Sequence, residues 1–374
     1  MTLSNISADA RLYLTPTWYV PTPIGLPDGA AARMGNGLIW FQGYELTALD
    51  GARRMARVTI PVADFANAIA ALPDGLAQRA LQLAANISAQ RPPLVAGDRT
   101  IRFDAPQVMA ILNITPDSFS DGGKHMGDPQ AAADAGFAMA AAGAALIDVG
   151  GESTRPKAPK LWEGDEIKRI APVIERLAAA GVPVSVDTRK AAVMEAALAA
   201  GAHVVNDVSA LAHDPRSLEV VVRAGCPVIL MHAPSAGDDP HDNPAGYGDV
   251  VADVFDHLES RIAACLAAGV ARERIMVDPG LGFGKSLADN LALVNGLATF
   301  QGLGVPLLFA GSRKRLIGAL SNEAPAADRL GGSVALAFRA AQLGAQMVRV
   351  HDVQESVQAL HLWRGLADAG LSAV

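Results

Sequence analysis

The sequence is poor in cysteine, in long apolar runs and in net positive charge. Its two cysteines, Cys226 and Cys265, lie apart in apolar stretches, which excludes a disulfide framework and a cysteine-based metal site. No apolar run reaches the ~18 residues that a membrane helix needs, and no secretory signal opens the chain. Because 38 acidic residues outnumber 31 basic ones, no overall field attracts nucleic acid. We therefore expect a cytoplasmic protein that binds neither membrane nor nucleic acid.

The chain is long enough for a large core, since 51% of its 374 residues are hydrophobic. Residues 1–93 differ from the rest, because proline and glycine punctuate the opening. The stretches 38–46 and 58–62 predict strands, and 64–83 has a helical pattern. We expect a small N-terminal α+β extension to which no motif assigns a role. The cluster Arg91-Pro92-Pro93 predicts a linker, and a short hairpin is expected within 94–103.

From residue 108 onward, a short apolar run is repeatedly followed by an alanine-rich helical stretch. The runs are 108–114, 145–149, 182–186, 204–208, 228–231, 275–277, 306–309 and 347–350. Alternating strands and helices predict parallel pairing through right-handed crossovers. Eight such units in roughly 280 residues have the count and size of a TIM barrel. We predict an α/β protein with a (β/α)8 barrel over 94–374; a doubly wound open sheet is the alternative, since periodicity alone does not close a barrel.

Polar side chains follow these apolar runs, and in a barrel they would converge at one mouth. Asp187, Asn206 and Asp278 offer acceptors and an amide, which suit a flat heterocycle with N–H donors. Other strand ends carry cations or groups that can become cationic, which suit a phosphate or diphosphate. These are Arg313, Lys314, Arg349 and His351. A single buried Asp could equally cap a helix, so the prediction of a ligand site depends on the whole set.

The stretch 278–286, D-P-G-L-G-F-G-K-S, combines an acid with three glycines after an apolar run. A phosphate-binding loop of the form G-x-x-x-x-G-K-[ST] would need glycine where Pro279 stands. The dinucleotide pattern G-x-G-x-x-G would need glycine where Lys285 stands. Asp278 is therefore the group that needs a functional explanation.

Seven segments together resemble the dihydropteroate synthase family. They are M-A-I-L-N-I-T-P-D-S-F-S-D-G-G (109–123), I-D-V-G-G-E-S-T-R-P (147–156), S-V-D-T (185–188), N-D-V-S (206–209), D-P-G-L-G-F-G-K (278–285), S-R-K (312–314) and R-V-H-D-V (349–353). The resemblance implies a TIM-barrel transferase of folate biosynthesis, inhibited by sulfonamides. It would join 6-hydroxymethyl-7,8-dihydropterin diphosphate to 4-aminobenzoate, with Mg2+ as cofactor and a homodimer as the assembly.

The resemblance also implies roles for individual residues. The pterin would be held by Asp187, Asn206, Asp278 and Lys314, with Met231 and Arg313 also in the substrate site. Asn113 would bind Mg2+, and Arg349 and His351 would bind the diphosphate. Loops carrying Phe119, Asp121, Ser153, Thr154 and Arg155 would complete the aminobenzoate pocket with Phe283 and Lys314. Among these residues, the family implies catalytic roles for Asp121, Lys314, Arg349 and His351.

Two other functions remain compatible with a pterin-binding barrel. One is a methyltransferase that uses methyltetrahydrofolate and a corrinoid protein, and the other is a non-catalytic pterin-binding or interaction protein. Asn113, Ser312-Arg313-Lys314 and Arg349-Val350-His351 favour the synthase, because a diphosphate substrate requires them and a methyl donor does not.

Overall fold

A parallel barrel forms the centre of the computed structural model, which describes residues 3, 6–115, 128–156 and 158–372. Its strands are β7 (Gln107–Asn113), β8 (Leu146–Gly150), β9 (Val184–Asp187), β10 (Val204–Asp207), β11 (Val228–Met231), β12 (Ile275–Asp278), β13 (Leu308–Phe309) and β14 (Met347–Val350). They pair in the order β12-β11-β10-β9-β8-β7-β14-β13. A parallel bridge between Val277 and Leu307 joins the two ends of this order. The predicted TIM barrel is confirmed, and the open sheet is excluded.

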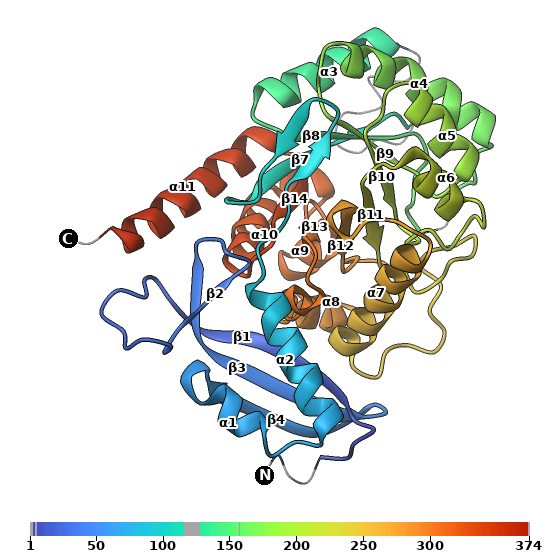
Figure 1. Cartoon of the computed structure of the whole chain (residues 1–374). Coiled ribbons are helices and arrows are strands. Elements are labelled where there is room, and N and C mark those ends of the chain that lie inside the picture. Colours follow the sequence, from blue (N-terminus) through green and yellow to red (C-terminus); the bar gives the residue numbers. More distant parts are fainter. Residues whose placement is uncertain (1–2, 4–5, 116–127, 157, 373–374) are drawn as a thin grey trace.

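Helices follow the strands and surround the barrel (Figure 1). They are α3 (Pro129–Ala141), α4 (Glu163–Ala179), α5 (Ala191–Ala199), α6 (Ser217–Ala224), α7 (Val250–Ala267), α8 (Leu287–Asn295), α9 (Arg315–Leu320), α10 (Leu330–Gln342) and α11 (Val353–Leu371), with 3-10 turns η3 (Arg272–Arg274), η4 (Leu297–Leu303) and η5 (Ala326–Asp328). In α4, buried Ile170, Val173, Ile174 and Leu177 recur at helical spacing and face the sheet. In the described part of the chain, no helix is long and apolar enough to cross a membrane.

A short hairpin closes the amino-terminal end of the barrel. It consists of β5 (Leu94–Ala96) and β6 (Arg99–Ile101), paired antiparallel. Its buried Leu94 and Ile101 pack in one cluster with residues near the strand starts, including Leu146 and Val204. Only the opposite end, where the strands finish, is then left for a ligand site.

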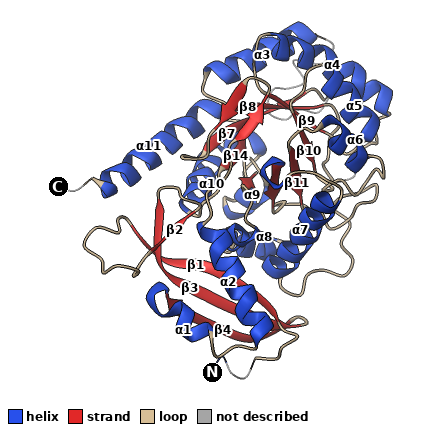
Figure 2. Ribbon diagram, in the orientation of Figure 1, coloured by secondary structure: helices blue, strands red, loops and turns tan. Residues whose placement is uncertain are grey.

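The first part of the chain forms an antiparallel sheet with two helices, in the lower part of Figures 1 and 2. The elements are β1 (Arg11–Val20), β2 (Ala32–Met34), β3 (Ile39–Asp50), β4 (Arg53–Pro61), η2 (Val62–Asp64), α1 (Phe65–Ile69) and α2 (Asp74–Ser88). The sequence patterns gave no strand at 11–20. This strand contains Pro16, but β1 pairs only with β3, and an edge strand tolerates a residue without an N–H donor. The helical pattern at 64–83 is broken by Pro73 into two helices.

This N-terminal sheet packs on the barrel through α7 and η4. Phe255 of α7 and Phe300 of η4 are fully buried in the same cluster as Leu83 of α2. At the edge of this contact, Arg79 donates two hydrogen bonds to Glu259, at 2.6 and 2.9 Å. The apolar core is therefore continuous across the contact.

Candidate active site

Arg349 at the end of β14 connects three strands across the barrel mouth. Its Nε lies 2.6 Å from Oδ2 of Asp148 on β8, and its Nη2 lies 2.7 Å from Oδ2 of Asp187 on β9. Asn206 on β10 donates through Nδ2 to Asp148 at 3.0 Å, and the Ser185 hydroxyl donates to the same carboxylate. Asp148 is fully buried, so its role is to hold Arg349 and Asn206 in place. The motif I-D-V signalled this acid, but its position as the centre of the cluster depends on the barrel.

Lys314 and Asp278 lie on the other side of the mouth. The Lys314 ammonium donates to the carbonyl of Leu281 and lies 5.0 Å from the centroid of the Phe283 ring. Desolvation lowers the pKa of Lys314 to about 8, although the carboxylate of Asp278 opposes the shift. The same desolvation raises the pKa of Asp278, with Lys314 acting against it. The two groups therefore stabilise each other's charged forms in a poorly solvated site.

The glycine-rich turn after β12 is shaped by close backbone packing. Oδ1 of Asp278 accepts a hydrogen bond from the Gly280 N–H at 2.7 Å. Gly280 has φ +68°, and a Cβ atom there would lie 1.9 Å from the carbonyl oxygen of His232. From below, the Lys285 ammonium donates to the carbonyls of Gly280 and Phe283 at 2.9 and 3.1 Å. The Lys285 ammonium is thus used to hold the backbone of the turn. In a phosphate-binding loop, the lysine would instead contact the phosphate.

His351 directly follows β14 and lies in a poorly solvated position. Its Nδ1 lies 3.0 Å from the hydroxyl of Ser312. Desolvation, together with Arg349 and Arg313, lowers the pKa of His351 to about 3. A pKa this low favours the neutral ring near pH 7 in the ligand-free protein. Arg313 is held by Asp352, with its Nε 3.0 Å from Oδ2.

An apolar patch lines the mouth between the two polar groups. Met231, Val208 and Ala233 form a small buried cluster, and Phe283 packs against it. A flat, partly apolar ring could lie on this patch while its edge meets the polar atoms of Asp187, Asn206 and Asp278.

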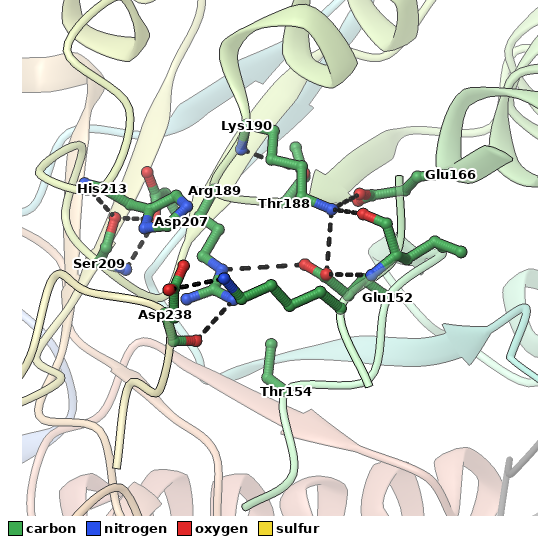
Figure 3. A network of polar contacts seen from close by, with 12 residues as sticks. Glu152, Thr154, Glu166, Thr188, Arg189, Lys190, Asp207, Ser209, His213 and Asp238 are labelled. Atoms are coloured by element: carbon green, nitrogen blue, oxygen red, sulfur yellow. Dashed lines mark hydrogen bonds and ion pairs between the residues drawn. The ribbon is translucent and has the colours of Figure 1, made fainter. Parts of the chain in front are cut away.

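The loop after β8 is fixed by a buried ionic network, drawn in Figure 3. The Lys190 ammonium lies 2.8 Å from Oε2 of Glu166, 3.0 Å from Oε1 of Glu152 and 2.6 Å from the carbonyl of Leu161. Glu152 and Leu161 stand at the two ends of this loop, so Lys190 closes it at its base. Sequence reasoning missed Glu166 and Lys190, because acids in a first helical turn and lysines after a strand are common surface features.

A pocket of 190 Å³ opens beside this loop, and Ser153, Thr154 and Arg155 line it. Arg189 contributes to the same pocket and donates to the carbonyls of Gly237 and Asp238 at 2.9 and 3.0 Å, in the loop after β11. The loops after β8 and β11 are thereby joined. The predicted residues Phe119 and Asp121 lie outside the described residues.

Asn113, the residue for which the family resemblance predicts a metal contact, lies at the end of β7. Its Oδ1 lies 3.2 Å from the point where a Cβ atom of Gly150 would stand, so Gly150 leaves space beside this oxygen. Within the described ranges there is no cluster of three His, Cys, Asp or Glu side chains that could hold a metal ion. Mg2+ can be held by one or two protein oxygens when substrate phosphates and waters supply the rest. A single amide oxygen such as that of Asn113 suits this mode of binding.

Comparisons with known proteins agree with this geometry. The pterin binding enzyme family matches residues 109–351. Dihydropteroate synthase of Escherichia coli (strain K12) is 43% identical over 281 residues, which are 75% of this chain and 97% of that protein. The Bacillus subtilis enzyme is 42% identical over 264 residues, 70% of this chain and 89% of that protein.

Solved structures of dihydropteroate synthases are also similar to this chain. Dihydropteroate synthase of Xanthomonas albilineans with 4-aminobenzoic acid has a TM-score of 0.69 and 46% identity, covering 74% of this chain and 98% of that one. The Yersinia pestis enzyme in complex with a sulfonamide drug has a TM-score of 0.70 and 43% identity, covering 74% and 99%. A further Xanthomonas albilineans structure contains 7,8-dihydropteroate.

Proposed function

Because the chain belongs to the dihydropteroate synthase family of pterin-binding enzymes, we propose that its barrel mouth binds a pterin diphosphate and an arylamine side by side. The chain is a transferase that condenses 6-hydroxymethyl-7,8-dihydropterin diphosphate with 4-aminobenzoate, giving 7,8-dihydropteroate and diphosphate. The observation that carries the assignment of the site is the convergence of Asp187, Asn206, Asp278 and Arg349 on one mouth.

The pterin edge is assigned to three oxygen acceptors. Arg349 engages Oδ2 of Asp187, and we assign Oδ1 to an N–H group of the pterin. Asn206 donates through its amide nitrogen to Asp148, which fixes its amide oxygen as the second acceptor. Asp278 keeps Oδ1 on the Gly280 N–H, which leaves Oδ2 as the third. Charge-assisted hydrogen bonds of this kind contribute about 1.5 to 3 kcal/mol each.

The diphosphate is assigned to Arg349, Asn113 and His351. The neutral His351 serves as a hydrogen-bonding group when the dianion arrives, and Arg349 supplies the fixed positive charge. When bound, Mg2+ at Asn113 would neutralise charge on the diphosphate oxygens and make them a better leaving group.

The reaction then consists of one bond broken and one formed. The C–O bond of the substrate CH2 group breaks, and its electron pair leaves with the diphosphate. The amine nitrogen of 4-aminobenzoate forms the new C–N bond, and its proton passes to the departing diphosphate or to water. Lys314, Phe283 and the Thr154 loop hold the arylamine in line with this carbon and exclude water, which would otherwise compete as the nucleophile.

Diphosphate release from the pterin diphosphate, with and without 4-aminobenzoate, tests this function. We expect release that depends on, or is strongly accelerated by, the arylamine, together with formation of 7,8-dihydropteroate. Absence of release under both conditions would refute the proposal. Lys314→Ala and Asp278→Ala should abolish turnover while the protein stays folded. Lys168→Ala on the exposed surface of α4 is the matched control, since this side chain is 73% exposed.

The assembly is also part of the proposal. The resemblance to the family implies a homodimer, and exposed leucines one turn apart on α11, Leu362 and Leu366, offer an apolar strip that a second copy could cover. Light scattering of the purified chain and of a Leu366→Asp variant tests this; a monomeric wild-type chain would contradict it.

A further inference from the structure

His241 lies in the loop 232–249, between β11 and α7, and no sequence motif marks it. Its ring stacks on the ring of Phe283, with centroids 4.7 Å apart and an angle of 11° between the planes. Phe283 is the residue assigned to the arylamine pocket. His241 therefore covers one of the side chains that face the second substrate.

The hydrogen bonds of His241 settle which ring nitrogen carries the proton. Nε2 lies 2.8 Å from the carbonyl oxygen of Thr154, and because a carbonyl can only accept, Nε2 must be the donor. Nδ1 faces the N–H of Gly284 at 3.4 Å, and it must therefore accept. The His241 ring thus connects the loops after β8, β11 and β12.

The loop around His241 is itself firmly held. The backbone N–H of His241 donates to Oδ1 of Asp239 at 2.8 Å. The side-chain amide of Asn243 donates to the carbonyl of Gly284 at 3.2 Å. Gly284, at φ +55°, packs so closely that a Cβ atom there would lie 2.4 Å from Pro234 and 2.8 Å from the His241 carbonyl oxygen. Such packing leaves the His241 ring little freedom to turn away from Phe283.

We propose that His241 is a positioning residue for the arylamine substrate: it fixes the plane of Phe283 and the carbonyl of Thr154, two walls of the pocket that receives 4-aminobenzoate. This inference rests on the proposed function of the site. His241 touches the pocket walls, while the pterin acceptors lie on β9, β10 and β12. The residue therefore acts on the second substrate and leaves recognition of the first unchanged.

Three substitutions separate the two contacts of His241. His241→Ala removes both the stacked ring and the donor, His241→Phe keeps a ring without the donor, and His241→Gln keeps a donor without the ring. The control is His213→Ala, because Nδ1 of His213 also bonds to the loop, at the carbonyl of Ala236 and 2.8 Å away. The control thus removes a histidine that supports the same loop at a different point.

Steady-state kinetics should show an effect confined to one substrate. Loss of an aromatic pair and a hydrogen bond is expected to raise KM for 4-aminobenzoate about tenfold in His241→Ala. KM for the pterin diphosphate should stay within about twofold, and kcat should change less than KM for the arylamine. His241→Phe and His241→Gln should each recover part of the loss. An equal rise in both KM values, or a His213→Ala variant with the same effect, would overturn the inference.

Hydrogen exchange of the substrate-free protein provides a readout that does not depend on turnover. In His241→Ala, the segments 153–156 and 280–286 should exchange faster than in the wild type and in His213→Ala. Unchanged exchange in both segments would refute the positioning role even if the enzyme is active. A wild-type chain that never releases diphosphate, with exchange altered as expected, would instead refute the proposed function and leave the connection between the loops standing.

Discussion

Replacement of Arg349 by methionine should destabilise the protein as well as inactivate it. The guanidinium pairs with Asp148, which is fully buried, and with Asp187, whose side chain is 15% exposed. Removing one partner from a buried pair typically costs about 3 to 5 kcal/mol. We expect the lower end, about 3 kcal/mol, because Ser185 and Asn206 still donate to Asp148. With a urea slope of about 3 kcal/mol per M, the unfolding midpoint would fall by about 1 M.

The loss of unfolding free energy in Arg349→Met, relative to the wild type, should depend on pH. Desolvation already raises the pKa of Asp187, and Arg349 opposes that rise. Without Arg349, the carboxyl pKa in the folded variant lies further above its value of about 3.9 in the unfolded chain. Between these two values the folded state binds more protons, so the stability of the variant falls as pH rises. Because the pKa of Asp187 is already about 7 with Arg349 present, the folded wild type and the folded variant differ in bound protons only above that pH. Urea unfolding should therefore show a larger loss of stability at about pH 8.5 than at pH 7.

A second variant makes this reasoning refutable. Adding Asp187→Asn to Arg349→Met removes one of the two carboxylates that lost its partner, so the double variant should be more stable at pH 7 than Arg349→Met alone. An unfolding midpoint for Arg349→Met that equals the wild-type value, or a loss of stability that is the same at both pH values, would show that the ion pairs do not hold the mouth together.

Three further outcomes follow from the structure. Since the pKa of Lys314 is lowered to about 8 and its ammonium is the active form, kcat/KM should fall as pH rises through 8. Lys314→Arg should move that fall to higher pH. A pH profile of kcat/KM that stays flat to pH 9 would contradict this role. Chelation of Mg2+ should abolish diphosphate release. Asn113→Ala should raise the Mg2+ concentration needed for half-maximal rate. Turnover that continues in the presence of a chelator would show that the reaction does not need Mg2+. Deletion of residues 1–93 should expose Phe255 and Phe300 and lower the melting temperature, and an equally stable truncated enzyme would show that the barrel folds alone.

The barrel could be predicted from sequence because its signal is local and repeated. Each strand is a short apolar run buried on both faces, such as Val228–Met231, and each is followed by a helical pattern. Boundaries were less accurate: the run at 182–186 begins pairing only at Val184, and within the run at 306–309 only Leu308–Phe309 forms a strand, with Leu307 in an isolated bridge. Strand ends are set by hydrogen bonds to a neighbouring strand, which apolar patterns do not specify.

Some residues of the site could also be predicted from local sequence patterns, and others could not. Asp187, Asn206 and Asp278 stand at strand ends, and the barrel brings them to one mouth as the pattern predicts. The contacts of Glu166, Lys190 and His241 could not be predicted, because each joins loops or helices that are distant in the sequence. The neutral state of His351 was also hidden, since it arises from desolvation and from two arginines, Arg313 and Arg349.

The N-terminal sheet is connected to the site through α7, which gives it physical consequences beyond its own fold. The tip of the β3–β4 hairpin reaches the start of this helix: Arg54 pairs with Asp249 at 3.1 Å, and Ala52 packs where a Cβ atom at Gly248 would lie 2.8 Å away. Asp249 caps α7 by accepting from the Ala252 N–H at 3.2 Å, and it ends the loop that carries His241. One end of that loop is held by the N-terminal sheet and its middle by Phe283 and Thr154. We therefore expect loss of the N-terminal sheet to loosen the loop that carries His241.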